Sequence, residues 1–250
     1  YECSGINHMS FFTKFEKKLD NGSKEDLYPK IYRAGEAGNF GTNGDGCSNY
    51  VRYDVLKKLG YFVTESSEHF AEYTPWFIKN QQKDLISKYE IPINEYIRRC
   101  EKQIQEWENQ EKELLSNPQT EFNKSMEYAS RIILSMVTGA KDTIYGNVLN
   151  KNFIPNLPHN SCVEVPCIIQ KNELTPQAVS PLPMHLANLI QTNINVQQLT
   201  VEALMTLKKE TVYHAAMLDP HTAGELNLDQ IWKMVDELID AHGPMLPNFK

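Results

Sequence analysis

The sequence predicts an α+β fold in which helices outnumber strands. Apolar residues recur at helical spacing in several segments along the chain. Segments with the alternation of a strand lie mainly after residue 140, apart from most of the helices, an arrangement typical of α+β domains. The 250 residues include 41% apolar and 23% charged residues, enough to bury the core of one large domain over 1–250.

The amino-terminal third is expected to hold a strand, a loop and a helix. Bulky residues in alternation predict a strand over Ile6–Phe15. The Gly- and Asn-rich stretch Gly35–Asn49 predicts a surface loop, with a cradle for substrate or phosphate as the alternative, although P-loop spacing is missing. Apolar residues at helical spacing predict a helix over Tyr50–Leu59, which Gly60 ends.

The middle of the chain is expected to be helical. A long charged segment over 84–115 carries an apolar stripe, and Pro92 predicts a break with a second helix from about Asn94. The stripe consists of Leu85, Ile86, Tyr89, Ile93, Ile97, Ile104 and Trp107. The charged run 101–113 is interpreted as a solvated face. A further helix is predicted from about Lys124 to Thr138, ended by Gly139.

Strands and two closing helices are expected in the last part. The predicted strands are Thr143–Val148, Val163–Ile169 and Gln177–Val179, with a hairpin turn at 170–173. Cys162 and Cys167 are an odd number of residues apart on one strand, so they face opposite sides and cannot pair. The amide-rich stretch 191–196 is interpreted as helix caps. Helices are predicted over Thr200–Met217 and Leu228–Ala241, the second with a capping box of Asn227 and Gln230.

Charge and cysteine content exclude several classes of partner. The net charge is −7 and no basic stripe is present, which argues against nucleic acid and anionic membranes. No apolar run is long enough for a membrane span, and the first residues lack the pattern of a signal peptide. Five irregularly spaced cysteines without a CxxC pair favour a reducing, cytoplasmic location.

Two segments carry residues suited to chemistry. His8 in Gly5-Ile6-Asn7-His8-Met9 is either a metal ligand or a hydrogen-bonded histidine, because no partner lies at helical or strand spacing. The segment 61–73 brings three carboxylates, a histidine and a tyrosine together: Glu65, Glu68, His69, Glu72 and Tyr73. This segment predicts either acid–base catalysis or a polar helix start with a serine cap.

A family resemblance adds to these readings. The phrases Gly5-Ile6-Asn7-His8, Thr64-Glu65-Ser66-Ser67-Glu68-His69-Phe70, Val163-Glu164-Val165-Pro166-Cys167 and Tyr213-His214-Ala215-Ala216-Met217 occur in order along the chain. They resemble the bacterial α-galactosidases, or melibiases, of glycoside hydrolase family 4. The resemblance implies that the chain is the carboxy-terminal domain of a family 4 glycosidase, with a fold of the lactate/malate dehydrogenase-like type. The amino-terminal Rossmann domain and the metal-ligand cysteine of the family are expected to be missing, so that the fragment alone is inactive.

The resemblance also implies a reaction and its cofactors. Family members use NAD and a divalent metal, usually Mn²⁺. They oxidise the sugar at C3, remove the C2 proton, eliminate the glycosidic oxygen and add water, outside the usual two-carboxylate scheme. His8 is then the metal-ligand histidine, and Asn7 and Arg52 are expected to bind substrate. The C2-proton base is expected among Tyr73, Glu68 and His69, with Tyr73 preferred, while the aspartate of one branch of the family aligns with Ser67.

Alternatives stay open at this point. A related family 4 α-glucosidase or α-galacturonidase changes only the substrate. An isolated sugar-binding or oligomerisation module is a different class of function. A homo-oligomer is expected in either case. If a domain is missing, an exposed apolar surface is expected near Ile6–Phe12.

Overall fold

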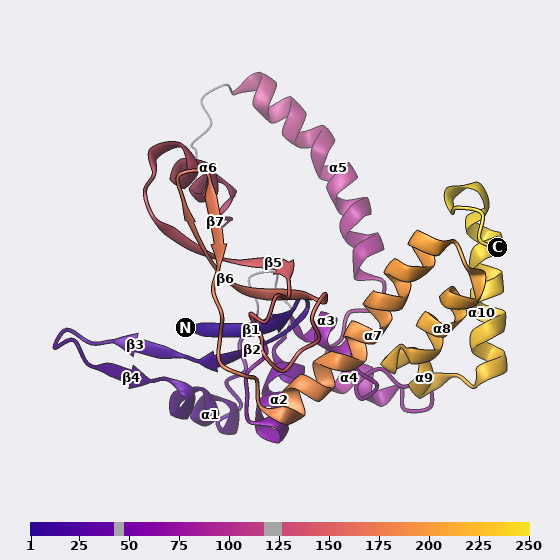
Figure 1. The fold of residues 1–250 in the computed structure, drawn as a ribbon, viewed down its shortest axis with the longest axis horizontal. Coiled ribbons are helices and arrows are strands. Elements are labelled where there is room, and N and C mark those ends of the chain that lie inside the picture. The colour runs from indigo at the N-terminus through magenta and orange to yellow at the C-terminus, as the bar shows by residue number, and fades with distance from the viewer. Residues whose placement is uncertain (43–47, 118–126) are drawn as a thin grey trace.

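The computed structural model describes residues 1–42, 48–117 and 127–250. Its main sheet is antiparallel, with strand order β2-β1-β6-β5 and with β7 beside β6. The strands are β1 (Glu2–Ile6), β2 (Met9–Lys14), β5 (Asp142–Leu149), β6 (Cys162–Gln170) and β7 (Glu173–Pro176). A separate hairpin of β3 (Glu16–Lys18) and β4 (Lys24–Asp26) extends from the body (Figure 1).

Helices hold most of the regular structure among the described residues, so the α+β prediction with a helical majority is confirmed. The helices before the long helix α5 are α1 (Tyr28–Glu36), α2 (Tyr50–Leu59), α3 (Ser67–Glu72) and α4 (Asp84–Lys88). The others are α5 (Glu95–Ser116), α6 (Ala129–Thr138), α7 (Met184–Thr206), α8 (Lys209–Leu218), α9 (Pro220–Glu225), α10 (Leu228–His242) and the short 3₁₀ turn Gly243–Met245. No helix within the described ranges combines the length and apolar character needed to cross a bilayer.

Several boundaries follow from the residues predicted to set them. Gly60 and Gly139 end α2 and α6 in the left-handed conformation, at φ 81° and 76°. Asn227 and Gln230 form the expected capping box of α10. The helical segment is interrupted around Pro92, because α4 ends at Lys88 and α5 starts at Glu95. Cys162 is exposed and Cys167 is buried, and both are free thiols.

Other predicted boundaries were wrong. The segment 6–15 is not one strand, because the chain reverses at Asn7 and His8 and pairs Ile6 with Met9 in a β1–β2 hairpin. Gly35 belongs to α1 rather than to a loop, while part of the Gly/Asn-rich stretch lies outside the described residues. Residues 177–179 follow β7 instead of forming a strand. The predicted helix 200–217 is two helices separated at Leu207, whose φ is 57°.

The helix predicted from Lys124 is observed from Ala129, and Lys124 itself lies outside the described residues. The predicted hairpin after β6 is present. Lys171 and Asn172 form its two-residue turn, both with positive φ, as a type I′ hairpin turn requires.

The core lies between the sheet and the helices α2, α3 and α7. Ile6, Met9 and Phe11 of the first hairpin are completely buried, so the apolar surface expected near Ile6–Phe12 is absent. They pack in one cluster with Val51 and Val55 of α2, Phe70 of α3, Val163 and Val165 of β6, and Leu186, Ile190 and Ile194 of α7. Burial of this apolar surface holds the hairpin turn and the start of α3 in place.

Candidate functional site

The turn of the first hairpin presents His8 at the edge of the core. Asn7 and His8 form its two-residue loop, and His8 has a φ of 63°, a left-handed conformation that histidine adopts more readily than bulky apolar residues do. Gly5 is required beneath this turn, because a Cβ there would lie 2.4 Å from the carbonyl oxygen of Met9. Asn7 is exposed on the turn. The backbone therefore fixes where the imidazole of His8 can lie.

Glu65 reaches His8 from a segment that runs beside β2. Val63 bridges to Phe11, and the Thr64 amide donates to the Ser10 carbonyl at 3.0 Å. The next side chain, Glu65, then accepts a hydrogen bond from His8, with Nδ1 2.8 Å from Oε2. Both side chains remain about one-third exposed, at 33% and 31%. The pair thus lies at the surface, where a ligand can reach it.

This hydrogen bond determines which ring nitrogen of His8 is available. A carboxylate can only accept, so Nδ1 of His8 carries the hydrogen that is shared with Glu65. In the neutral imidazole the lone pair is then on Nε2. A carboxylate behind a histidine is the usual partner of a metal-ligating imidazole. His8 therefore has the tautomer and the exposure of a metal ligand.

Arg52 supports the same segment from α2. Its Nε and Nη2 donate to the Val63 carbonyl at 3.1 and 2.7 Å, Nη1 donates to Asn49 Oδ1 at 2.9 Å, and the guanidinium lies 4.4 Å from the ring centroid of Phe62. These contacts anchor the backbone that presents Glu65. The structure places Arg52 as a support of the site.

Helix α3 brings the other expected residues to His8. Ser66 is the N-cap and accepts from the His69 amide at 3.3 Å, as the helix-start interpretation predicted. The ring of His69 lies 4.4 Å from that of His8, centroid to centroid, and its Nδ1 is 3.1 Å from Glu72 Oε2. The ring of Tyr73, directly after the helix, lies 5.8 Å from His8. His8, Glu65, His69 and Tyr73 thus form one cluster, called the His8 cluster below.

Glu68 points elsewhere. It is 5% exposed and lies 3.7 Å from the guanidinium of Arg99 in α5. Burial, and then the charge of Glu72, raise the pKa of Glu68, while His69 and Arg99 oppose that shift. The structure does not bring Glu68 into the His8 cluster. Beside it, the hydroxyl of Ser67 is buried and has no hydrogen-bond partner among the described residues.

Two further residues at the cluster were not expected there. Glu164 of β6 pairs with Gly5 of β1, and burial, followed by the charge of Glu65, raises the pKa of Glu164, while His8 lowers it. Asn193 of α7 is buried, and its Nδ2 donates to the Tyr73 carbonyl at 3.2 Å. A helix cap was the wrong interpretation of Asn193. The signal for Glu164 was a carboxylate among apolar strand residues.

The cluster does not form a complete metal site by itself. No group of three or more His, Cys, Asp or Glu side chains that could hold a metal occurs within 1–42, 48–117 and 127–250. His8 could provide one ligand, with Glu65 as its supporting carboxylate. The residues present therefore fit a cation only together with ligands from outside the described parts of the chain.

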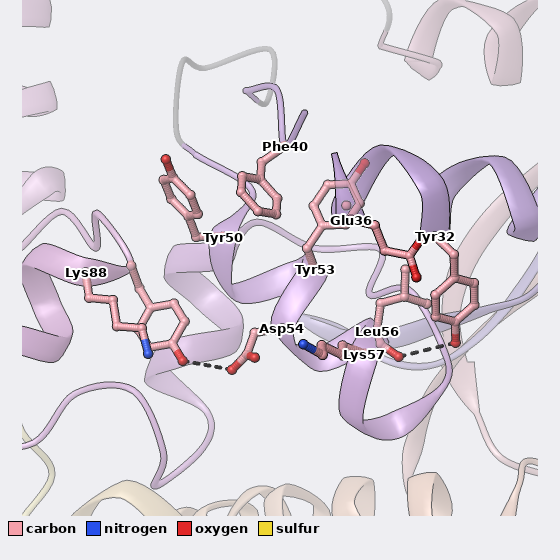
Figure 2. A pocket seen from close by; sticks show the side chains of 11 residues that line it. Tyr32, Glu36, Phe40, Tyr50, Tyr53, Asp54, Leu56, Lys57 and Lys88 are labelled. Atoms are coloured by element: carbon pink, nitrogen blue, oxygen red, sulfur yellow. Dashed lines mark hydrogen bonds between the residues drawn. The ribbon is translucent and has the colours of Figure 1, made fainter. Parts of the chain in front are cut away.

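A separate cavity of about 460 Å³ lies away from these residues. Figure 2 shows it between α1, α2 and the end of α4, with Tyr32, Phe40, Tyr50 and Tyr53 around it. Tyr89 donates to Asp54 at 2.8 Å at one side, and Lys57 and Lys88 contribute ammonium groups. None of Asn7, His8, Arg52, Glu68, His69 and Tyr73 lines this cavity, but Gly35, Glu36 and Phe40 of the Gly- and Asn-rich stretch do.

Comparison with known proteins identifies what the chain is similar to. The model of the "Family 4 glycosyl hydrolase C-terminal domain" matches residues 3–222. The α-galactosidase of Bacillus subtilis is 46% identical over 247 residues, which cover 99% of this chain and 55% of that protein. The α-galactosidase of Rhizobium meliloti is 29% identical over 100% of this chain and 51% of its own length. The chain spans about half the length of the curated relatives it matches.

Solved structures show the same fold. A 6-phospho-α-glucosidase from gut microorganisms, determined in complex with NAD and Mn²⁺, matches with a TM-score of 0.77 and 17% identity. The match covers 100% of this chain and 56% of that chain.

Proposed function

The chain belongs to glycosyl hydrolase family 4 as its C-terminal domain, and on that premise we propose that it is the substrate-binding half of an NAD- and Mn²⁺-dependent α-galactosidase. The observation that supports this most is the His8 cluster, in which a partly exposed histidine is paired with a carboxylate and lies beside a tyrosine. The 46% identity to an α-galactosidase favours α-galactosides of the melibiose type over the substrates of α-glucosidases or α-galacturonidases.

The cluster supports a division of roles among its residues. His8 would hold the divalent cation through Nε2, and Glu65 would keep the imidazole in that tautomer. When bound, the cation supplies Lewis acidity toward the sugar oxygens and NAD supplies a hydride acceptor. Asn7, exposed on the same turn, is positioned to contact the sugar. The remaining metal ligands and the NAD site would come from the other half of a longer protein, so this chain alone would be inactive.

Tyr73 is the preferred base for the proton at C2 of the sugar. Burial, and then the carboxylates of Glu72, Glu65 and Asp219, raise the pKa of Tyr73, so its phenol is protonated at neutral pH in this chain. A tyrosine at this position can accept a proton only if positive charge nearby opposes those carboxylates. A cation held at His8, whose ring is 5.8 Å from that of Tyr73, would provide that charge. Base and metal site would then depend on each other.

His69 and Glu68 differ in their suitability for the same task. His69 lies in the cluster and is oriented by Glu72. Glu68 is turned toward Arg99 and is enclosed by protein. Glu164 adds a carboxyl whose pKa is raised by burial and then by the charge of Glu65. The proposal therefore assigns proton removal to Tyr73 first and His69 second.

The proposal is tested on a protein that joins this chain to an amino-terminal half like that of the relatives. Melibiose hydrolysis should require both NAD and Mn²⁺, and His8→Ala should abolish it while the circular dichroism spectrum stays unchanged. Glu108→Ala on α5 is the matched control, because this residue is exposed and far along that helix. Full activity of the His8→Ala variant, or hydrolysis without NAD, would contradict the proposal.

A second function, an isolated sugar-binding module, is favoured by the aromatic cavity. Its volume of about 460 Å³ lies in the range of small-molecule sites, and tyrosine rings with flanking carboxylates suit a sugar ring. Melibiose binding by the 250-residue chain, measured by calorimetry, tests it. Binding that Tyr50→Ala removes and His8→Ala leaves unchanged would support the module, and the absence of binding would exclude it.

A further inference from the structure

Tyr73 is the first residue of a segment, 73–80, that the structure describes in full and that forms neither helix nor strand. The beginning of this segment is held by two long-lived kinds of contact. The Tyr73 carbonyl accepts from Asn193 Nδ2 at 3.2 Å, and the Thr74 hydroxyl donates to the Phe70 carbonyl at 3.1 Å. Because regular backbone hydrogen bonds do not continue to residue 80, the position of the segment depends on further tertiary contacts.

Helix α9 supplies these contacts at the other end of the segment. The Asn80 amide donates to Glu225 Oε2 at 2.8 Å, and Lys79 Nζ lies 3.1 Å from Glu225 Oε1. Lys79 Nζ also donates to the Gly224 carbonyl at 3.2 Å. The Lys79 and Glu225 side chains are only 27% and 17% exposed, so solvent screens the ion pair less than it screens a fully exposed pair. These contacts of Lys79 and Asn80 with Gly224 and Glu225 are called the α9 clamp below.

Gly224 lets α9 approach the segment closely. A Cβ on Gly224 would lie 2.9 Å from the Pro75 Cβ and 3.2 Å from Lys79 Nζ. The helix backbone therefore packs directly on Pro75, which follows Tyr73 by two residues, and only a glycine allows so short an approach. The contact surface of α9 extends from the α9 clamp to the immediate neighbourhood of Tyr73.

The start of α9 lies near the phenol of Tyr73. Asp219 is the N-cap of the helix, and its Oδ1 accepts from the Thr222 amide at 2.7 Å. Burial and then neighbouring carboxylates, Asp219 among them, raise the pKa of Tyr73. Since the effect of a charge falls with distance, Asp219 is close to the phenol. Helix α9 thus runs along the segment from Tyr73 to Asn80.

We propose that Glu225 is a positioning residue, which holds the segment 73–80 so that Tyr73 stays in the His8 cluster. This inference rests on the proposed function, in which Tyr73 removes the C2 proton. A base must lie within hydrogen-bond reach of the proton it removes, and a displacement of about 1 Å can cost about 10²-fold in rate. The anchor is firm, because α9 packs on α8, and α8 packs on both α7 and α10.

Hydrogen exchange tests the hold on the segment in the protein that includes the amino-terminal half. The Tyr73 amide donates to the His69 carbonyl at 3.1 Å, a bond that Glu225→Ala leaves in place. Glu225→Ala should nevertheless speed exchange of this amide at least threefold, while the amides of β1 and β2 keep their rates. Glu237→Ala is the matched control, because Glu237 pairs with Lys233 at 3.6 Å on α10 and does not contact the segment. An unchanged Tyr73 amide in Glu225→Ala would overturn the proposal whatever the activity.

Steady-state kinetics on melibiose tests the consequence for the reaction. Glu225→Ala should lower kcat of the folded fraction about tenfold and leave KM within about twofold, because the residues that bind the sugar are untouched. A residue that only stabilises the fold would leave this kcat unchanged. Lys79→Ala should also be slower, and the double variant should be no slower than Glu225→Ala, because both substitutions break the same contact. Losses that multiply, or a full kcat in Glu225→Ala, would overturn the proposal.

Two further variants separate this inference from the proposed function. Gly224→Ala keeps both charges of the α9 clamp but displaces Pro75, so it should lower kcat in the same way. A full kcat in this variant would contradict the role of α9. Tyr73→Phe tests the base itself. If Tyr73→Phe reaches the full rate, the assignment of the base fails, and the exchange of the Tyr73 amide still decides whether Glu225 holds the segment.

Discussion

The imidazole Nδ1 of His8 lies 2.8 Å from the Oε2 of Glu65, although 57 residues separate them in the chain. The first belongs to a hairpin turn and the second to the segment before α3. Burial of Ile6, Met9, Phe11 and Val63 in one core brings these two segments together. The hydrogen bond to Glu65 fixes the orientation of the His8 imidazole, as the proposed role of metal ligand requires.

The first prediction concerns the carboxylate of this pair. In the protein that includes the amino-terminal half, Glu65→Gln should lower Mn²⁺ affinity about 10- to 100-fold, the usual effect of removing the partner of a ligating histidine. Titration calorimetry measures the affinity directly. Glu72→Gln is the matched control, because Glu72 contacts His69 instead of His8. Equal affinities of the two variants would show that Glu65 does not orient the ligand.

The second prediction concerns the support of Tyr73. Asn193→Ala removes the Nδ2 donor that satisfies the Tyr73 carbonyl and leaves a gap in a buried region. The free energy of unfolding should fall by about 1–3 kcal/mol, as when a buried polar group loses its partner. Urea titration measures it, with Gln198→Ala on the exposed face of α7 as the control. A loss no greater than that of the control would contradict the contact.

The third prediction concerns the turn below His8. Gly5→Ala would place a Cβ 2.4 Å from the Met9 carbonyl oxygen and 2.6 Å from the Ser10 Cα, both in the backbone. The strands must separate, so the variant should lose more than about 1 kcal/mol of stability. Gly22→Ala, where a Cβ meets nothing within 4 Å although φ is 84°, measures the cost of positive φ alone. Thermal unfolding of the two variants separates crowding from φ strain, and equal losses would exclude crowding.

The fourth prediction concerns pH. The Asn80 amide donates to Glu225 at 2.8 Å, and this bond, followed by Lys79 at 3.1 Å, lowers the pKa of Glu225. Because the folded value is below the unfolded one, the stabilisation is present above the unfolded pKa and is lost as pH falls through the folded pKa. Lys79→Met should raise the pKa of Glu225 toward its ordinary value, as carboxyl NMR titration can show. An unchanged titration would mean that Lys79 does not contribute.

Much of the fold was predictable where local chemistry sets it. Gly60, Gly139 and the Asn227–Gln230 box ended or started helices as expected. The errors have long-range causes. The turn at Asn7–His8 depends on the pairing of β1 with β2 and on the buried Gly5. At Leu207 the chain leaves α7, and the next helix, α8, packs back against α7. The hydrophobic periodicity of the sequence indicates neither this turn nor this helix break.

The candidate site was predictable only in part. His8, His69 and Tyr73 were singled out from the sequence and do lie together. Arg52 and Glu68 were also singled out, but Arg52 donates to the Val63 carbonyl among its other contacts, and Glu68 faces Arg99. Glu164 and Asn193 come from a strand and a helix more than 90 residues further along, and only the packing of β6 and α7 brings them near. The apolar stripe on α5 was recognised in the sequence, but the periodicity of apolar residues does not show whether other parts of the protein cover them.

Incorporation of solvent deuterium tests the central claim most directly. Glu65 and Glu164, which lie near enough for one to raise the pKa of the other, are the carboxyls that an ordinary two-carboxylate glycosidase would use at this site. In that case the hydrogen at C2 of the sugar never exchanges with solvent. If Tyr73 removes the C2 proton, melibiose hydrolysed in D₂O with NAD and Mn²⁺ by the protein that includes the amino-terminal half should release galactose with deuterium at C2. Tyr73→Phe should slow that release about 10²- to 10⁴-fold, the usual scale of general base catalysis. Galactose released at the full rate without deuterium at C2 would contradict the account.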